Sequence, residues 1–412
     1  MHDLGLVLDL GTSTLRARLI DLLHGECLAE RHVLNPHDIL SRDVISRVLT
    51  SQTDQPLQEE MTRSLREGVS DVISRVLSGA RVRPSMVSSS IVVCNTVMHS
   101  LFLGLRCDGL LQHPYIVHGR RDITCTGPDL GIDDLPKAEF HIPAPVESFV
   151  GSDALAVALW SALRLGSSGV LSVDIGANTE ISVLTDDHIL FASVASGPAF
   201  EDMSIECGMP AADGAIHEVR LSDDLRPEYS VIGGQRPLGL CGSGVVSLLS
   251  EMRRVGILNE GGSIDRSVRS DRIGTIGHSA VFYVVYPDVY LSQLDIRMLQ
   301  LSKAAVQAGI LTLLNEAGYR CQDIRSTLIT GAFGNALRID DAIGIGMLPR
   351  LDRVVQRECA ALDGATLMLI DDDARETADD LRRRSRHVSL RDNPVFEQLF
   401  EQSRVFAPWV SI

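Results

Sequence analysis

The chain has 412 residues, of which 45% are hydrophobic and only 4% aromatic, and its formal net charge is −16 at pH 7. This length exceeds that of a usual single core, so two or more domains are expected, packed mainly by aliphatic side chains and alanine. The negative charge excludes a nucleic-acid partner held by a basic surface, because such binding needs a basic footprint.

The sequence predicts neither a secretory leader nor a membrane span. Its first residues, MHDLGLVLDLG, run into a strand without a basic leader. No apolar run approaches the ~20 residues that cross a bilayer. The eight cysteines include no C-x-x-C pair, which argues against a metal or iron–sulfur site built from neighbouring thiols. We therefore expect a cytoplasmic protein with reduced thiols and no membrane partner.

The first predicted element is a strand, a tight turn and a second strand over residues 6–19, LVLDLGTSTLRARL. A similar pattern recurs over residues 170–184, VLSVDIGANTEISVL. Such internal similarity predicts two related lobes. In the first copy the strand ends at Asp9 and the turn holds Gly11, Thr12, Ser13 and Thr14; in the second the strand ends at Asp174 and the turn holds Gly176, Ala177, Asn178 and Thr179.

The chemistry of these two turns favours phosphate and magnesium. Glycine lets a ligand approach the backbone, consecutive N–H groups can bind an anion, and hydroxyls add donors. An aspartate just before the turn can hold Mg²⁺ directly or through its water. One such turn alone is better explained as an ordinary hairpin, and the matched pair favours a ligand site. Neither copy is a Walker loop or a G-x-G-x-x-G turn, because a strand follows each.

Between the copies, we expect an amphipathic helix over 58–77 and a helix beginning at 43–49. A buried strand over 88–93 ends in the polar turn Cys94-Asn95-Thr96. Residues 105–148 read as loops with edge strands, and 149–165 as a helix crossing between lobes.

In the second lobe, glycines open a predicted helix within residues 238–258. Gly242, Ser243 and Gly244 suit a phosphate at the helix N-terminus, and a tight turn explains them equally well. Residues 259–290 look like an insertion with one strand. We expect a long helix over 291–314, with one apolar face made of Leu294, Met298, Leu301, Ala305, Ala308 and Leu311.

Lys303, inside that long helix, is one of two lysines in a chain that otherwise uses arginine. It is either a compact ammonium with a specific role or a solvated surface side chain. A strand over 328–330 then leads into a third glycine turn, which could lie against an adenine–ribose unit; it comprises Gly331, Ala332, Phe333, Gly334 and Asn335. We expect a strand over 366–370 and a solvated charged helix over 371–387.

Nearly the whole chain resembles the ATP-dependent reductive activators of corrinoid proteins, within the acetate and sugar kinase/heat-shock protein/actin superfamily. The resemblance rests on the order of DLGTST, CNTVMH, FVGSDA, DIGANTE, SGPAFE, CGMPAADGAI, PLGLCGSG, the QLDIR helix and GAFGN. It implies an α/β fold with two actin-like lobes, each a ribonuclease H-like domain, that clamp ATP and Mg²⁺. The expected division is lobe I over 1–150, lobe II over 151–349, and a C-terminal part over 350–412 that packs back on lobe I.

The resemblance also implies roles for these residues. Gly11–Thr14 and Gly176–Thr179 would be phosphate loops, and Gly331–Asn335 an adenosine loop with Lys303 as a neighbour of the base. Asp9 and Asp174 would hold magnesium or its waters and act in catalysis. Family members use ATP to drive the one-electron reduction of Co(II) to Co(I) on a partner corrinoid protein or corrinoid methyltransferase.

The sequence departs from this family in its electron-carrying part. Known members carry a ferredoxin-like domain or cysteine clusters, which this sequence lacks, so we expect no iron–sulfur cluster here and a separate low-potential electron donor. The alternatives are a small-molecule kinase, an activator of another metallocofactor enzyme, and a nucleotide-binding filament protein. The sequence leaves the oligomeric state open, a homodimer included.

Overall fold

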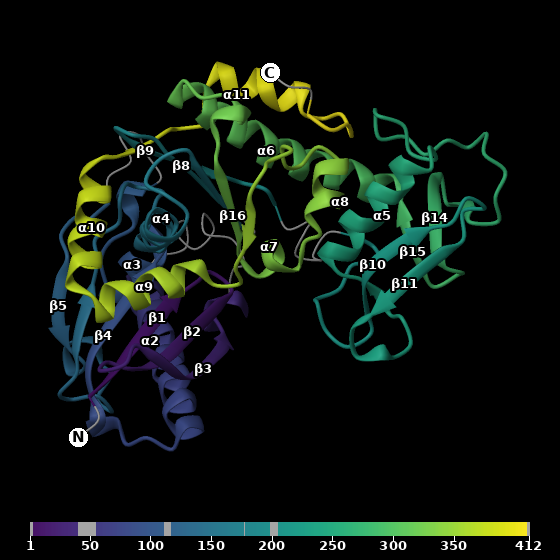
Figure 1. Cartoon of the computed structure of the whole chain (residues 1–412). Coiled ribbons are helices and arrows are strands. Elements are labelled where there is room, and N and C mark those ends of the chain that lie inside the picture. Colours follow the sequence, from purple (N-terminus) through teal and green to yellow (C-terminus); the bar gives the residue numbers. More distant parts are fainter. Residues whose placement is uncertain (1–2, 40–54, 111–116, 177, 198–204, 410–412) are drawn as a thin grey trace. The chain divides into compact units, whose positions relative to one another are not determined.

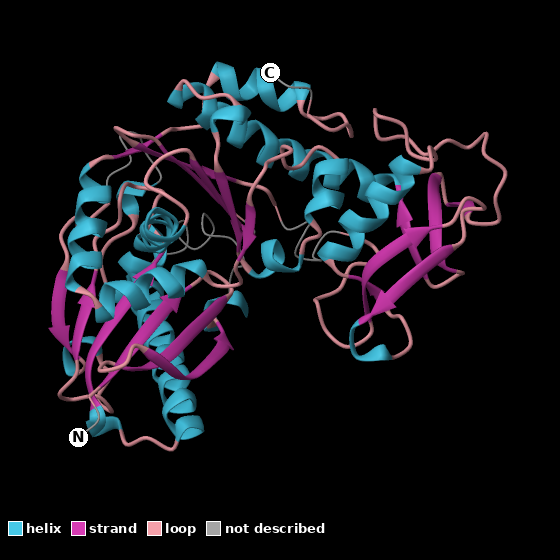
Figure 2. Cartoon of the chain, in the orientation of Figure 1, coloured by secondary structure: helices cyan, strands magenta, loops and turns pink. Residues whose placement is uncertain are grey.

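A computed structural model describes residues 3–39, 55–110, 117–176, 178–197 and 205–409. The chain folds as a mixed α/β protein (Figures 1 and 2). Its contacts divide it into two compact units that interleave along the sequence. Unit 1 comprises residues 1–168, 184–191 and 359–387, and unit 2 comprises 169–183, 192–358 and 388–412. The predicted lobes, with boundaries at residues 150 and 349, divide the chain differently, and that division stays a prediction.

The first sheet has six strands in the order β3-β2-β1-β4-β6-β5. Strands β1, β2 and β3 form an antiparallel meander, and β4 runs parallel to β1. The predicted strand over 88–93 is thus confirmed. Of the two strands within 105–148, β5 is an edge strand as predicted, whereas β6 lies between β4 and β5. The strands are β1 (Leu4–Leu10), β2 (Thr14–Asp21), β3 (Glu26–Leu34), β4 (Val87–Cys94), β5 (Ile123–Thr126) and β6 (Glu139–Ile142).

The second sheet has the order β17-β16-β7-β8-β9-β18. Read from β9 to β17, it repeats the order of the first sheet from β3 to β6, and the edge strands β5 and β18 lie at opposite ends. Its β7, β8 and β9 correspond to the meander β1, β2 and β3, and β16 runs parallel to β7 as β4 does to β1. The internal repeat predicted from the two Asp-x-Gly turns is therefore a repeat of topology. The strands are β7 (Val170–Ile175), β8 (Thr179–Leu184), β9 (Ile189–Val194), β16 (Ser326–Thr330), β17 (Val354–Gln356) and β18 (Ser385–His387).

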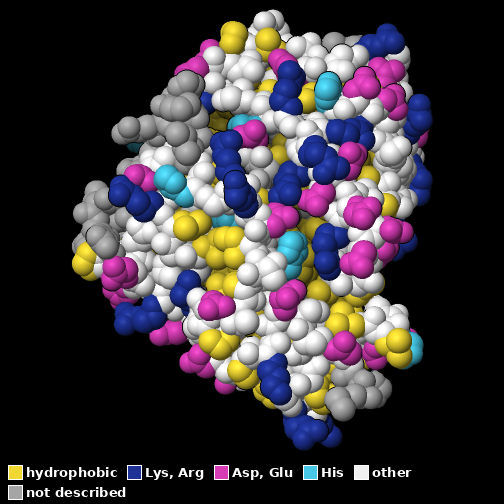
Figure 3. All heavy atoms as spheres, turned by 90° about the vertical axis from the view of Figure 1, so that its left-hand side faces the viewer, with side chains coloured by type: hydrophobic (Ala, Val, Ile, Leu, Met, Phe, Trp, Pro, Cys, Tyr) yellow, Lys and Arg dark blue, Asp and Glu magenta, His cyan; other side chains and the backbone are white. Residues whose placement is uncertain are grey.

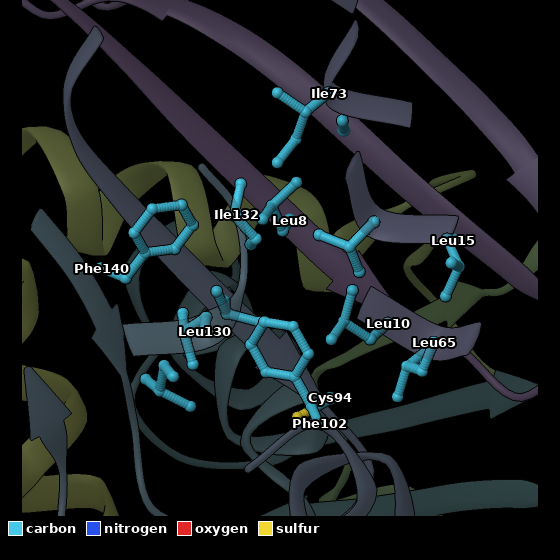
Figure 4. Close-up of a cluster of buried hydrophobic side chains, with 14 of the residues drawn as sticks. Leu8, Leu10, Leu15, Leu65, Ile73, Cys94, Phe102, Leu130, Ile132 and Phe140 are labelled. Atoms are coloured by element: carbon cyan, nitrogen blue, oxygen red, sulfur yellow. The ribbon is translucent and has the colours of Figure 1, made fainter. Parts of the chain in front are cut away.

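The hydrophobic core of unit 1 lies between the first sheet and its helices (Figure 4). Alternating residues of β1 enter it, among them Leu8 and Leu10, and helix α2 supplies Leu65 and Ile73. The predicted amphipathic helix over 58–77 is confirmed. The helices of unit 1 are α2 (Gln55–Ala80), α3 (Thr96–Leu103), α4 (Ser152–Arg164), α9 (Ala360–Ile370) and α10 (Asp372–Arg383). The helix expected to begin at 43–49 falls outside the described residues.

Unit 2 also holds two three-stranded sheets and the remaining helices. The sheets are β11-β10-β12 and β13-β14-β15. Their strands are β10 (Ala215–Leu221), β11 (Pro227–Val231), β12 (Gly239–Leu240), β13 (Ile273–Ile276), β14 (Ser279–Val285) and β15 (Val289–Ser292). The helices are α5 (Gly242–Arg254), α6 (Gln293–Ala317), α7 (Ala332–Ala336), α8 (Ile339–Gly344) and α11 (Pro394–Gln402). The prediction of a single strand within 259–290 is wrong, because β14 pairs with a strand on each side.

Short 3₁₀ helices complete the described chain. They comprise Pro36–Ile39, Pro84–Met86, Asp108–Leu110, Pro128–Leu130, Ile232–Gly234 and Cys321–Asp323.

The strand predicted over 366–370 is wrong, because this run is the end of helix α9. A short apolar run such as TLMLI cannot be told from a buried helix by periodicity alone. The buried residues Ala360, Gly364 and Met368 recur at intervals of four, which is the helical period. A Cβ added at Gly364 would come 1.9 Å from the carbonyl oxygen of Ala156, so α9 and α4 pack backbone to backbone.

Helix α6 is confirmed, but the apolar face predicted for it is wrong in its first half. Leu294, Met298 and Leu301 are 62%, 39% and 45% exposed. The residues that face the core there are Ile296 and Leu299. With roughly 100° of rotation per residue, these two apolar stripes lie on nearly opposite sides of the helix, and the periodicity of the sequence could not rank them.

The charged helix predicted over 371–387 is confirmed as α10, except that its last residues, 385–387, form strand β18. Its first turn is acidic and its last turn is basic, which complements the helix dipole. Arg382 pairs with Asp379 at 2.8 Å and Arg383 with Asp380 at 3.5 Å. On the face of the molecule shown in Figure 3, acidic and basic side chains are interspersed rather than gathered by sign.

Candidate functional site

The first Asp-x-Gly turn is a tight loop between β1 and β2. The N–H of Gly11 donates to the carbonyl of Thr14 at 3.0 Å. A Cβ added at Gly11 would come 2.8 Å from that same carbonyl oxygen, so the turn has no room for a side chain there. Thr12, Ser13 and Thr14 remain partly exposed. The loop can therefore present backbone N–H groups and hydroxyls to a ligand.

Two asparagines hold this first loop from outside it. Asn35 is 1% exposed. Its side-chain amide donates to the carbonyl of Gly11 at 2.9 Å, and its backbone N–H donates to the carbonyl of Ser13 at 2.8 Å. Asn95 donates its side-chain amide to the hydroxyl oxygen of Thr12 at 3.1 Å. The sequence predicted neither contact, although Asn95 lies in a polar turn between a strand and a helix, a place that often faces a ligand.

Asp9 lies near the carboxyl end of β1, paired in register with Arg16 on one side and Val93 on the other. Burial raises the pKa of the neighbouring Cys94 thiol, and the charges of Asp153 and Asp9 raise it further. Burial also raises the pKa of Asp153 to about 6. Asp153 is thus a second carboxyl group, besides Asp9, whose charge acts on Cys94, and the sequence did not assign it to the site.

The second turn, between β7 and β8, is pinned by a buried serine. Ser196 donates its hydroxyl to the carbonyl of Gly176 at 3.0 Å. The hydroxyls of Ser196 and Thr179 lie 2.9 Å apart, and Thr179 is fully buried. Asn178 is partly exposed, whereas Ala177 falls outside the described residues.

The third glycine turn lies directly against Asp174. Thr330, the last residue of β16, pairs in register with Asp174 on β7, so the two strands end side by side. Gly331 follows with a φ of +89°, and a Cβ there would come 2.6 Å from Oδ1 of Asp174. The second and third predicted loops therefore meet within unit 2.

Helix α7 carries the rest of this third loop. Phe333 is 9% exposed, and Asn335 is exposed. Ala332 is the first residue of α7. Gln356 donates its side-chain amide to the carbonyls of Gly334 at 2.9 Å and Asn335 at 3.2 Å, which fixes the end of the helix from the neighbouring strand β17. Gln356 gave no signal in the sequence.

The glycines at the start of α5 are explained in part by packing. A Cβ added at Gly244 would come 2.1 Å from the carbonyl oxygen of Ile216 on β10. Gly244 is therefore required for close packing of α5 on that strand. Gly242 begins the helix, and Ser243 lies 3.4 Å from the Cys241 sulfur. A phosphate at this helix N-terminus stays a prediction.

Lys303 is not a solvated side chain, so that alternative is wrong. It is fully buried, and its Nζ donates to the carbonyls of Ser403 at 2.6 Å and Val405 at 2.5 Å. Burial lowers its pKa to about 7. Lys303 thus fastens the C-terminal segment to α6. Its place beside an adenine base stays a prediction.

Asp9 and Asp174, each taken by itself, have the chemistry that suits magnesium. Each is a partly exposed carboxylate at the end of a central strand, beside a glycine turn, and carboxylate oxygens suit this hard cation. In the described ranges, no three His, Cys, Asp or Glu side chains gather as a metal site. The eight cysteines, all of them in described segments, form no disulfide bond. The expectation that this chain holds no iron–sulfur cluster stays a prediction.

No described helix is long and apolar enough to cross a membrane.

Two sheets that share the order of five strands, each with an Asp-x-Gly hairpin at the equivalent place, define a two-lobed actin-like ATPase fold. A family model described as the C-terminal domain of RACo, the ASKHA domain, matches residues 168–409. A second model, described as the RACo middle region, matches residues 4–165. The chain belongs to the RACo family, because the first model alone covers more than half of it.

Curated relatives carry the same resemblance. The chain is 28% identical over 424 residues to the corrinoid activation enzyme RamQ of Eubacterium limosum, covering 99% of this chain and 71% of the relative. It is 23% identical over 376 residues to the [Co(II) methylated amine-specific corrinoid protein] reductase of Methanosarcina barkeri, covering 84% of this chain and 66% of the relative.

A solved structure agrees in fold over almost the whole chain. The reductive activator for corrinoid,iron-sulfur protein superposes with a TM-score of 0.86 at 28% identity, covering 98% of this chain. This chain spans only 66% of that structure's length.

Proposed function

We propose that this protein binds and hydrolyses ATP and uses it to drive the reduction of a corrinoid protein from Co(II) to Co(I). The observation that carries the proposal is the duplicated Asp-x-Gly hairpin in a chain of the RACo family. Relatives named for corrinoid activation and for Co(II) corrinoid protein reduction support the reaction class. The partner would be a corrinoid protein of a methyltransferase system in the cytoplasm.

The chain's own residues would contribute binding and charge stabilisation. The loop that begins at Gly11 and the loop that begins at Gly176 would each present N–H groups to phosphate oxygens. Asp9 and Asp174 would hold Mg²⁺ or its waters, and one of them would orient the attacking water. Bound magnesium would supply neutralisation of the phosphate charge.

The electron would come from a separate low-potential donor. Neither Asp-x-Gly loop nor the turn at Gly331 carries a redox group, and the eight cysteines are dispersed along the sequence without a C-x-x-C pair. ATP would then supply free energy through conformation rather than through an electron carried on the chain.

The test is ATP hydrolysis by the purified protein, alone and with Co(II) corrinoid proteins under a low-potential reductant. The proposal expects turnover stimulated by one such protein together with the absorbance of Co(I). Substrate-dependent ATP turnover with a small hydroxylated molecule, and none with a corrinoid protein, would instead support a kinase.

A further inference from the structure

Asn95 connects the first loop to the N-terminus of helix α3. Its Oδ1 accepts from the backbone N–H groups of Val97 at 3.1 Å and Met98 at 3.0 Å, as an N-cap does. Because these two donors require an oxygen, the side-chain nitrogen must be the atom that faces Thr12. That nitrogen donates to the Thr12 hydroxyl oxygen at 3.1 Å. The N-cap of α3 therefore determines that Asn95 is the donor, and Thr12 the acceptor, in the hydrogen bond between them.

The direction of this bond determines what the Thr12 hydroxyl can do. A hydroxyl has one hydrogen to donate and two lone pairs that accept. Thr12 accepts from Asn95, so this bond leaves its hydrogen for another acceptor. The side chain is partly exposed, and a phosphate oxygen is such an acceptor.

Thr179 on the second loop has the opposite arrangement. A carbonyl can only accept, so Ser196 must use its single hydrogen on the carbonyl of Gly176. The 2.9 Å bond between the two hydroxyls must then be donated by Thr179. Its hydrogen is therefore committed to Ser196, and its side chain is fully buried.

We propose that Asn95 is a positioning residue that turns the Thr12 hydroxyl hydrogen toward a bound phosphate, and that Thr12, rather than Thr179, is the threonine that donates to the nucleotide. This inference rests on the proposed binding of ATP. In it the two equivalent hairpins are chemically different: the first offers a hydroxyl donor, whereas the second uses its threonine to hold the shape of its turn.

The test compares Thr12→Val, Asn95→Ser and the double variant in the full chain. Serine is as good an N-cap as asparagine, but it is too short to reach Thr12. We expect each single variant to weaken ATP binding by about tenfold, the scale of one hydrogen bond to a charged group. We expect the double variant to be no weaker than Thr12→Val, because both changes remove the same contact. Affinity for adenosine, which has no phosphate, should stay unchanged in all three.

Two further variants separate this role from a structural one. Ser100→Ala removes a hydroxyl that bonds within α3 and should leave ATP affinity at the wild-type value. Thr179→Val should lower the unfolding midpoint and weaken ATP binding less than Thr12→Val does.

Two results would overturn the inference while the wild type still binds ATP. One is additive losses for Asn95→Ser and Thr12→Val. The other is an equal loss of adenosine and ATP affinity. A wild-type protein that binds no ATP would instead refute the proposed function itself.

Discussion

The backbone of Gly331 lies against the carboxylate of Asp174, so closely that a Cβ on the glycine would come 2.6 Å from Oδ1. The same Cβ would come 2.6 Å from the carbonyl oxygen of Ile175. Two loops that are far apart in the sequence therefore share one packing contact within unit 2. A change in either loop should affect the other.

Gly331→Ala is expected to reduce both stability and ATP affinity. The φ of +89° disfavours alanine, and the added methyl group has no space beside Asp174. We expect a loss of about 1–3 kcal/mol in the free energy of unfolding, measured by urea denaturation, together with weaker ATP binding. Gly318→Ala is the matched control, because its φ is +66° and nothing lies within 4 Å. If the control lost ATP affinity equally, the effect of Gly331→Ala would not be local.

Asp174→Asn is expected to abolish ATP turnover while leaving the fold intact. Asparagine keeps the shape of the side chain but removes the negative charge that would hold magnesium or its water. We expect turnover to fall by at least about 100-fold, the scale at which a catalytic electrostatic contact acts, with an unchanged circular dichroism spectrum. Asp271→Asn, at a side chain that is 91% exposed, is the control. A variant that hydrolyses ATP normally would refute the assignment of the second phosphate loop.

Asp153 is expected to give ATP turnover an acidic limb near pH 6. Burial raises the pKa of this carboxyl group to about 6, and its charge acts on Cys94 at the end of β4. The carboxylate form should therefore be lost as the pH falls through 6. We expect wild-type turnover to decline there, and the limb to disappear in Asp153→Asn. The exposed Asp372→Asn variant should keep the limb, and a wild-type limb that persists in Asp153→Asn would contradict the assignment.

Lys303 is expected to make stability rise with pH above neutrality. Its pKa is about 7 when folded and 10.5 in the unfolded reference, so between these values the unfolded chain binds the extra proton. The contribution of Lys303 to stability should therefore be greatest above pH 10.5 and be lost as the pH falls toward 7, with a slope of at most about 1.4 kcal/mol per pH unit. The difference in unfolding free energy between wild type and Lys303→Met should thus grow from pH 7 to pH 9.

A control and a contrary result define that experiment. Lys137→Met is the control, because it makes the same substitution at the other lysine of the chain, which is exposed. A wild-type advantage over Lys303→Met that stays constant between pH 7 and pH 9 would mean that the carbonyls of Ser403 and Val405 keep the ammonium charged.

The repeated fold was predictable because its signal is local. An aspartate, a glycine and small polar residues must follow one another to make each turn, so the pattern is visible in a short window around Gly11 or Gly176. The order of strands in both sheets agrees with the predicted repeat. Helix α9 was misread as a strand because a short buried run has no distinctive period.

The supports of the site could not be predicted, because their contacts are distant in sequence. Asn35 and Asn95 reach the first loop across 24 and 83 residues. Lys303 bonds to a carbonyl 100 residues away. An asparagine or a lysine can form hydrogen bonds with many groups, and only the folded structure determines which of them lies within reach. The roles of Asp9, Asp174 and the three loops in nucleotide binding stay predictions.

The most direct test of the central claim is ATP turnover measured together with the corrinoid absorbance, under a low-potential reductant. With a Co(II) corrinoid protein of a methyltransferase system present, we expect stimulated hydrolysis and the appearance of Co(I), both lost in Asp174→Asn. Hydrolysis that is indifferent to every corrinoid protein tested, with no Co(I) formed, would contradict the claim that this chain is a corrinoid activator.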